Sequence, residues 1–114
     1  MALARGNLEI LSRYIAQWSA KGWAWWVPPV AGTTAFVKFT RDGRVVDAVE
    51  FCMRLQAQTG VMFLPGDRGF GDSNGEKYEG YVRIGYVPET TVLVEGLRLC
   101  DEWMGKHWHE LTLW

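Results

Sequence analysis

The stretch 60–86 constrains the fold of this chain more than any other part of it. It opens with a short apolar run, 61–64, which ends at the turn-forming pair Pro65-Gly66. Glycines and polar residues follow, a composition typical of a long loop. An apolar pattern returns at 81–86, with the single arginine Arg83 inside it. The stretch therefore predicts two strands joined by a glycine-rich loop, with one cation on the second strand.

Side chains of a strand alternate between its two faces, so the neighbours of Arg83 indicate its direction. Val82 and Ile84 point one way, whereas Tyr81, Arg83 and Gly85 point the other. If the apolar pair packs under helices, Arg83 projects from the uncovered face. There its guanidinium could offer two parallel donors to a carboxylate. A solvated arginine at the sheet surface is the alternative that the spacing leaves open.

The first half of the chain predicts a helix and another strand. Apolar residues at helical spacing predict a helix over 3–20 that stops at Gly22. An aromatic, proline-containing segment, 23–32, follows and is expected to be extended. Alternation predicts a strand over 33–40, with a turn at 41–44.

Two further helices are indicated by their ends. Asp47 and Glu50 have the spacing of a capping box, and Gly60 suits the C-terminal end of the helix that they start. Pro88 can open the last helix, which we expect to end near Gly105. Its buried stripe consists of Leu93, Leu97, Cys100 and Met104.

These elements predict one domain of the α+β class over residues 1–114. A small three-stranded, mainly antiparallel sheet is expected, with helices covering one of its faces. An opening helix occupies 1–22, and the sheet and remaining helices occupy 23–114. The second face of the sheet is left open to something else.

Composition excludes several classes of partner. With 12 basic and 13 acidic residues, the net charge of −1 gives no reason to expect nucleic acid or an anionic membrane. The sequence shows neither a signal peptide nor a membrane span. Cys52 and Cys100 fall in helical patterns and are expected to be buried thiols, which suits a reducing compartment such as the cytoplasm. His107 and His109 lack a third ligand, so no metal site is expected.

Tryptophan is abundant, with 7 residues in 114. Trp23, Trp25 and Trp26 stand together just before two prolines. Such a cluster packs either in the domain core or against a partner, and the sequence leaves both readings open.

Several segments together resemble the C-terminal small domain of the fold-type I (class I/II) aminotransferases that depend on pyridoxal phosphate. The likeness lies in the run 60–66, the pair Phe70-Gly71, the strand around Arg83, and the segment 29–36, which follows a P-x-x-G-x-x-x-F pattern. It reaches from the opening helix to about Met104, but it corresponds only to the last part of a family member.

The resemblance implies roles for four residues. Arg83 would bind the carboxylate of the substrate, and Gly32 would lie beside that substrate. Phe70 and Gly71 would belong to a loop that borders the active site. Without the resemblance, Gly32 reads equally well as a glycine at the start of a strand, and the loop as a plain hairpin connection.

The resemblance also implies what this stretch lacks. The family's Schiff-base lysine lies upstream of the part that this chain matches, so we expect no catalysis by the chain itself. Pyridoxal 5'-phosphate is expected in the full-length enzyme, and none is expected to be held by this chain alone. The implied partners are the missing large domain, an amino acid or 2-oxo acid substrate, and another copy of the protein in a homo-oligomer.

Two other readings remain open: a stand-alone binding or interaction module derived from that domain, and a domain with no surviving activity. The sequence leaves undecided which amino acid or oxo acid is used, and whether the chemistry is transamination. It also leaves undecided the natural length of the chain and its oligomeric state.

Overall fold

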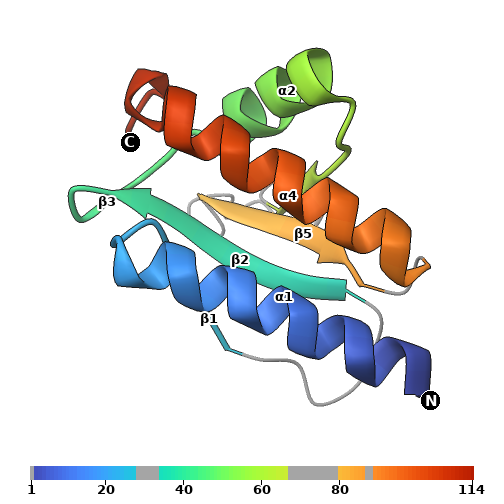
Figure 1. The fold of residues 1–114 in the computed structure, drawn as a ribbon. Coiled ribbons are helices and arrows are strands. Elements are labelled where there is room, and N and C mark those ends of the chain that lie inside the picture. Colours follow the sequence, from blue (N-terminus) through green and yellow to red (C-terminus); the bar gives the residue numbers. More distant parts are fainter. Residues whose placement is uncertain (1, 28–33, 67–79, 87–88) are drawn as a thin grey trace.

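The computed structural model describes residues 2–27, 34–66, 80–86 and 89–114, and the side chains from residue 6 onward (Figure 1). All strand pairs are antiparallel, and the sheet runs in the order β1-β2-β5-β4, with β3 paired to β2. The strands are β1 (Ala24–Trp26), β2 (Thr34–Arg41), β3 (Arg44–Val45), β4 (Leu64–Pro65) and β5 (Tyr81–Gly85).

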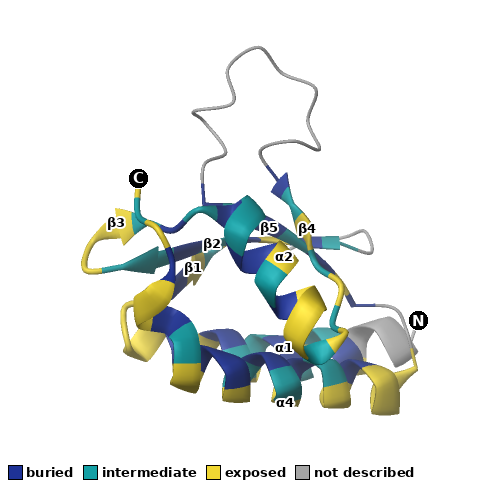
Figure 2. Ribbon diagram, turned by 90° about the horizontal axis from the view of Figure 1, so that it is seen from above, coloured by how far each residue is buried: buried dark blue, intermediate teal, exposed yellow. Residues whose placement is uncertain are grey.

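Helices cover one face of this sheet. The helices are α1 (Ala2–Ala20), α2 (Ala48–Thr59) and α4 (Thr90–His107), followed by the short 3₁₀ helix η2 (Trp108–Glu110). Helices α1 and α4 lie side by side across the sheet, and α2 packs beside α4, against β4 and β5 (Figures 1 and 2). None of the helices in the described ranges has the length and apolar character needed to cross a bilayer.

The core lies between the helices and the inner face of β2 and β5. Alternate residues of these strands, Ala35, Val37, Phe39, Val82 and Ile84, are buried, as the alternation predicts. Aromatic rings fill the centre. The ring of Phe39 lies 4.9 Å from that of Phe51 and 5.8 Å from those of Trp18 and Trp108. This burial fixes the direction of the strands, and therefore which side chains reach the other face.

The predicted fold class is confirmed, but the sheet has more strands than the three expected. Strands β1 and β3 were not predicted, because two or three residues are too few to show alternation. The hairpin between β2 and β3 turns at Asp42 and Gly43, whose φ angles are 54° and 77°. Both lie in the left-handed region, as a two-residue hairpin turn of the primed type requires.

Helix ends follow the predicted signals in part. Asp47 caps α2 by accepting a hydrogen bond from the backbone N–H of Glu50, and Gly60 ends α2 with a φ of 81°. The carboxylate of Glu50 accepts from the N–H of Thr112 at 2.7 Å, where a complete capping box would use the N–H of Asp47. Helix α4 runs past Gly105 to His107, and Pro88 lies outside the described residues.

Candidate functional site

The register of the sheet brings a set of side chains together on the face that the helices leave uncovered. Arg83 of β5 pairs with Phe36 of β2 and with Leu64 of β4. In the adjacent row, Lys38 of β2 pairs with Tyr81 and with Trp25 of β1. Residues paired across strands share a face. We call this surface the open face, made of Trp25, Phe36, Lys38, Leu64, Tyr81 and Arg83.

Apolar side chains surround the cation at the centre of the open face. Trp25 is 54% exposed, Leu64 47% and Phe36 37%. Two of them, Phe36 and Leu64, are the direct cross-strand neighbours of Arg83. The arginine is thus held between apolar groups instead of carboxylates. This arrangement lowers the local dielectric and strengthens any interaction between Arg83 and an anion.

Arg83 is half-buried, and its Nε atom is fully buried without a hydrogen-bond partner. It is the one buried side-chain nitrogen or oxygen atom in that state among the described residues. Leaving a buried donor unsatisfied costs about 1–3 kcal/mol, and more for a charged group. Most buried polar groups are paired, so an unpaired one at the centre of an uncovered face indicates a site that favours an acceptor.

The strand itself is held by residues that have no part in the site. Val82 and Ile84, on either side of Arg83, are both buried under the helices. Gly80, just before the strand, approaches so closely that an added Cβ would lie 2.8 Å from the Cβ of Val45. These contacts fix the position of β5, and they direct the guanidinium away from the core.

Of the other residues that the sequence singled out, Trp25 lies on this face, and three are not described by the structure. Gly32, Phe70 and Gly71 lie outside the described residues, so their predicted roles stay predictions. The tryptophan cluster divides: Trp23 and Trp26 pack against the core, whereas Trp25 stands on the open face. Lys38, which was given no binding role from the sequence, lies on this face through its pairs with Trp25 and Tyr81.

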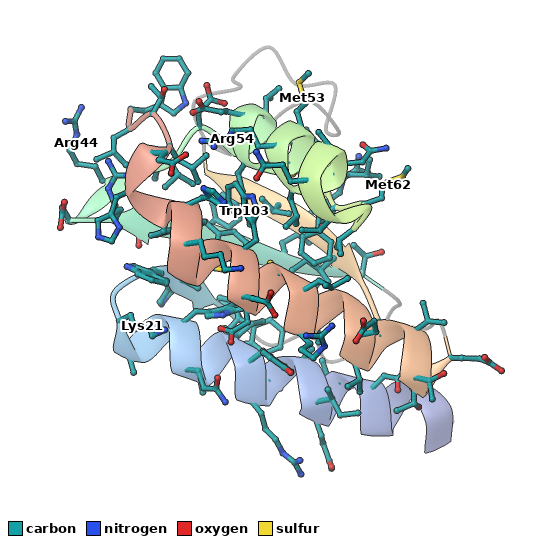
Figure 3. All side chains as sticks on the ribbon, turned by 45° about the horizontal axis from the view of Figure 1, so that its top comes forward. Lys21, Arg44, Met53, Arg54, Met62 and Trp103 are labelled. Atoms are coloured by element: carbon teal, nitrogen blue, oxygen red, sulfur yellow. The ribbon has the colours of Figure 1, made fainter. Side chains whose placement is uncertain are left out.

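A second concentration of polar side chains lies where α2, α4 and η2 meet. Arg54 donates to Glu110 at 2.6 Å and lies 5.4 Å from the ring of Trp103 (Figure 3). The other oxygen of Glu110 is 3.0 Å from Nδ1 of His107. Hydrogen bonds from Arg54 and then from His107 lower the pKa of Glu110. These contacts join three elements, and we read the cluster as structural.

An apolar cleft of about 430 Å³ lies on the helical side, between the end of α2 and the first half of α4. Met62 at its rim is exposed, as is Met53 on α2 (Figure 3). The cleft is lined mainly by apolar side chains and offers no charged group to orient a ligand. Within the described ranges, no three histidine, cysteine or acidic side chains come together in a way that could hold a metal ion.

A pyridoxal phosphate site would need more than the open face provides. Holding that cofactor takes a lysine for covalent attachment and an acidic partner for the pyridine nitrogen. The open face carries Lys38 and Arg83, but no carboxylate in the described part of the chain. The described residues of the open face thus offer two cations to an anion, and the other groups that this cofactor needs are not among them.

Comparison with solved structures shows which known proteins share this fold. An aminotransferase from Streptococcus suis that depends on pyridoxal phosphate matches 92% of this chain with a TM-score of 0.71 and 27% identity. A probable N-succinyldiaminopimelate aminotransferase from Thermus thermophilus matches 88% with a TM-score of 0.61 and 31% identity. The chain has the fold of an aminotransferase small domain. An aspartate aminotransferase from Thermotoga maritima, 19% identical, shares that fold with a TM-score of 0.66.

The aminotransferase small domain is only a part of each of these structures. The chain spans 25%, 23% and 24% of their respective lengths, about a quarter in each case. No protein-family model matches the sequence, and no curated protein does. The three-dimensional comparison therefore carries the assignment, and it agrees with the likeness seen in the sequence.

Proposed function

We propose that this chain is the C-terminal, carboxylate-binding domain of an aminotransferase that depends on pyridoxal phosphate. It would act in amino-group transfer between an amino acid and a 2-oxo acid, and it would not be catalytic by itself. The observation that carries the proposal is the buried, unpartnered Nε of Arg83 at the centre of the open face. The aminotransferase fold around it supplies the context.

The proposed work of this domain is to bind and orient the substrate. Arg83 would donate two parallel hydrogen bonds to the substrate carboxylate, which fixes both its position and its angle. Phe36 and Leu64 would exclude water from that ion pair and so strengthen it. The cofactor, bound mainly by the rest of the enzyme, would supply the electron sink that amino-group transfer requires.

The domain division and the location are part of the same proposal. Residues 1–22 would form the helix that joins this domain to a large domain, and 23–114 would form the carboxylate-binding unit. That large domain is implied by the quarter coverage of the matched structures, and it would provide the lysine, the remaining cofactor ligands and the main contacts of any homo-oligomer. Both cysteines are buried, which is compatible with a cytoplasmic enzyme.

A stand-alone binding module with the same fold is the alternative. It would keep the anion-binding open face but would have no large domain to cover the apolar residues there. The two functions predict different masses for the natural polypeptide. Intact mass spectrometry of the endogenous protein separates them: a species far heavier than 13.0 kDa supports the enzyme domain, whereas one at 13.0 kDa supports the module.

The role of Arg83 is tested by Arg83→Lys in the natural polypeptide. Lysine keeps the charge but loses the two-pronged geometry, so catalytic efficiency should fall by about 10- to 100-fold. Arg98→Lys is the matched control, because Arg98 pairs with Glu95 and Glu102 on the exposed side of α4. Unchanged kcat/KM in Arg83→Lys would remove Arg83 from the site.

A further inference from the structure

Four residues of the open face form a square in the register of β2 and β5. Phe36 pairs with Arg83, and Lys38, two residues further along β2, pairs with Tyr81. The two cations therefore occupy one diagonal of the square and the two aromatic side chains occupy the other. Residues on such a diagonal lie about 7–8 Å apart at the backbone. Both cations are thus within reach of one small ligand.

The two cations lack a carboxylate of their own in the described part of the chain. Arg41, Arg54, Arg98 and Lys106 form ion pairs with acidic side chains, whereas Lys38 and Arg83 form none with the acidic residues that the structure describes. Like charges on neighbouring positions of one face repel each other. The repulsion between Lys38 and Arg83 is relieved when an anion binds between their side chains.

The other diagonal of the square, made of Phe36 and Tyr81, makes its centre partly apolar. Phe36 is more than a third exposed, and Tyr81 is half-buried beside it. A ligand that joins Arg83 to Lys38 must cross between these two rings. A short chain of methylene groups with a carboxylate at each end would suit that path, because its middle is apolar and its ends are anionic.

We propose that Lys38 recognises a second anionic group of a ligand whose first carboxylate is bound by Arg83, so that the site takes a short dicarboxylate. The inference rests on the proposed function of Arg83 and adds the class of substrate to it. The two residue types suit these two roles. Arginine fixes one planar carboxylate in a defined orientation, whereas lysine is a point charge on a flexible stem. The second carboxylate can therefore lie at a variable distance.

The test is an NMR titration of the ¹⁵N-labelled 114-residue chain with glutarate and with butyrate, at constant ionic strength. Butyrate has one carboxylate and a similar length. The unchanged chain should bind glutarate about fivefold more tightly than butyrate, and Lys38→Gln should abolish that difference without weakening butyrate binding. Lys38→Arg should preserve the preference, because it keeps a cation at this position.

Lys106→Gln is the matched control, since it removes the same charge from α4, on the covered side of the sheet. If Lys38→Gln weakens both ligands equally, or neither, Lys38 is not a second recognition residue and the inference is overturned. If Lys38→Gln fails to fold, Lys38→Met provides the same comparison. Arg83→Gln should abolish binding of both ligands. Failure of the unchanged chain to bind either ligand would overturn the proposed role of Arg83, and the inference with it.

Discussion

Because Gly80 has no side chain, its backbone can lie close to β2 and β3 at the start of β5. Its φ of 81° lies in the left-handed region, and an added Cβ would also lie 3.2 Å from the backbone oxygen of Phe39. Its own carbonyl accepts a hydrogen bond from the N–H of Phe39 at 2.8 Å. The strand that carries Arg83 therefore depends on a glycine immediately before it.

Gly80→Ala should destabilise the domain by about 1–3 kcal/mol, because it combines backbone strain with a clash against Val45. Gly105→Ala is the control. Gly105 lies inside α4, where an added Cβ meets nothing within 4 Å, so alanine should stabilise the domain by about 0.5–1 kcal/mol. Urea denaturation measures both free energies of unfolding. Equal stability of the two variants would contradict the role given to Gly80.

At this scale, the sequence predicted the direction of Arg83 but not its environment. Alternation between Val82 and Ile84 was enough to place the guanidinium on the uncovered face, and the structure agrees. The buried, unpartnered Nε could not be foreseen, because it depends on contacts across strands that are far apart in the sequence. Lys38 carried the same alternation signal, but only the register with Tyr81 places it diagonal to Arg83.

Among the elements, η2 is tied to both neighbouring helices through one carboxylate. Glu110 accepts from Arg54 of α2 and contacts His107 at the end of α4. These contacts lower its pKa in the folded chain below the ordinary value of 4.5. A lowered folded-state pKa means that the stabilisation is fully present above the unfolded value and is lost as pH falls through the folded one.

Glu110→Gln should therefore be less stable than the unchanged chain at neutral pH, and the difference should shrink below about pH 4.5. Thermal unfolding between pH 7 and pH 3 measures it. Glu102→Gln serves as a control, because its ion-pair partners in the described part of the chain, Arg98 and Lys106, both belong to α4. A difference between Glu110→Gln and the unchanged chain that stays constant across this range would show that the carboxylate charge plays no part.

Elements with strong local signals were predicted well, and the shortest ones were missed. Helix α2 has a capping aspartate and a terminal glycine, and α4 has a regular apolar stripe, so local interactions specify both. Strands β1 and β3 are defined by their pairing with β2, which their own two or three residues do not signal. The expected strand over 61–64 shrinks to Leu64–Pro65, since only these residues pair with β5.

At the scale of the whole molecule, the described part of the chain shows where three of its lysines lie. Lys21 lies over the ring of Trp23, and Lys106 pairs with Glu102. Lys38 shares the open face with Arg83 but with no carboxylate for a pyridine nitrogen. The proposed division of labour, in which a large domain supplies the cofactor chemistry, is compatible with these contacts.

Mixing the 114-residue chain with pyridoxal phosphate and then reducing with borohydride should give no stoichiometric adduct at any single lysine. The reason is that covalent attachment needs an activated lysine together with ligands for the rest of the cofactor. Peptide mass mapping provides the measurement, and free lysine at equal concentration shows the background reaction. A full equivalent of adduct at one position, such as Lys38, would contradict the expectation.

The exposed indole of Trp25 gives this surface an optical signal of its own. Trp18 and Trp108 are fully buried in the core, so collisional quenchers in solution reach them poorly, whereas more than half of Trp25 is open to solvent. Any molecule that packs on the open face, whether a larger part of the same enzyme or another protein, would shield the indole of Trp25 from solvent. Trp114 is 57% exposed as well, so the part of the accessible tryptophan fluorescence that Trp25→Phe removes is the part that reports whether the sheet is covered.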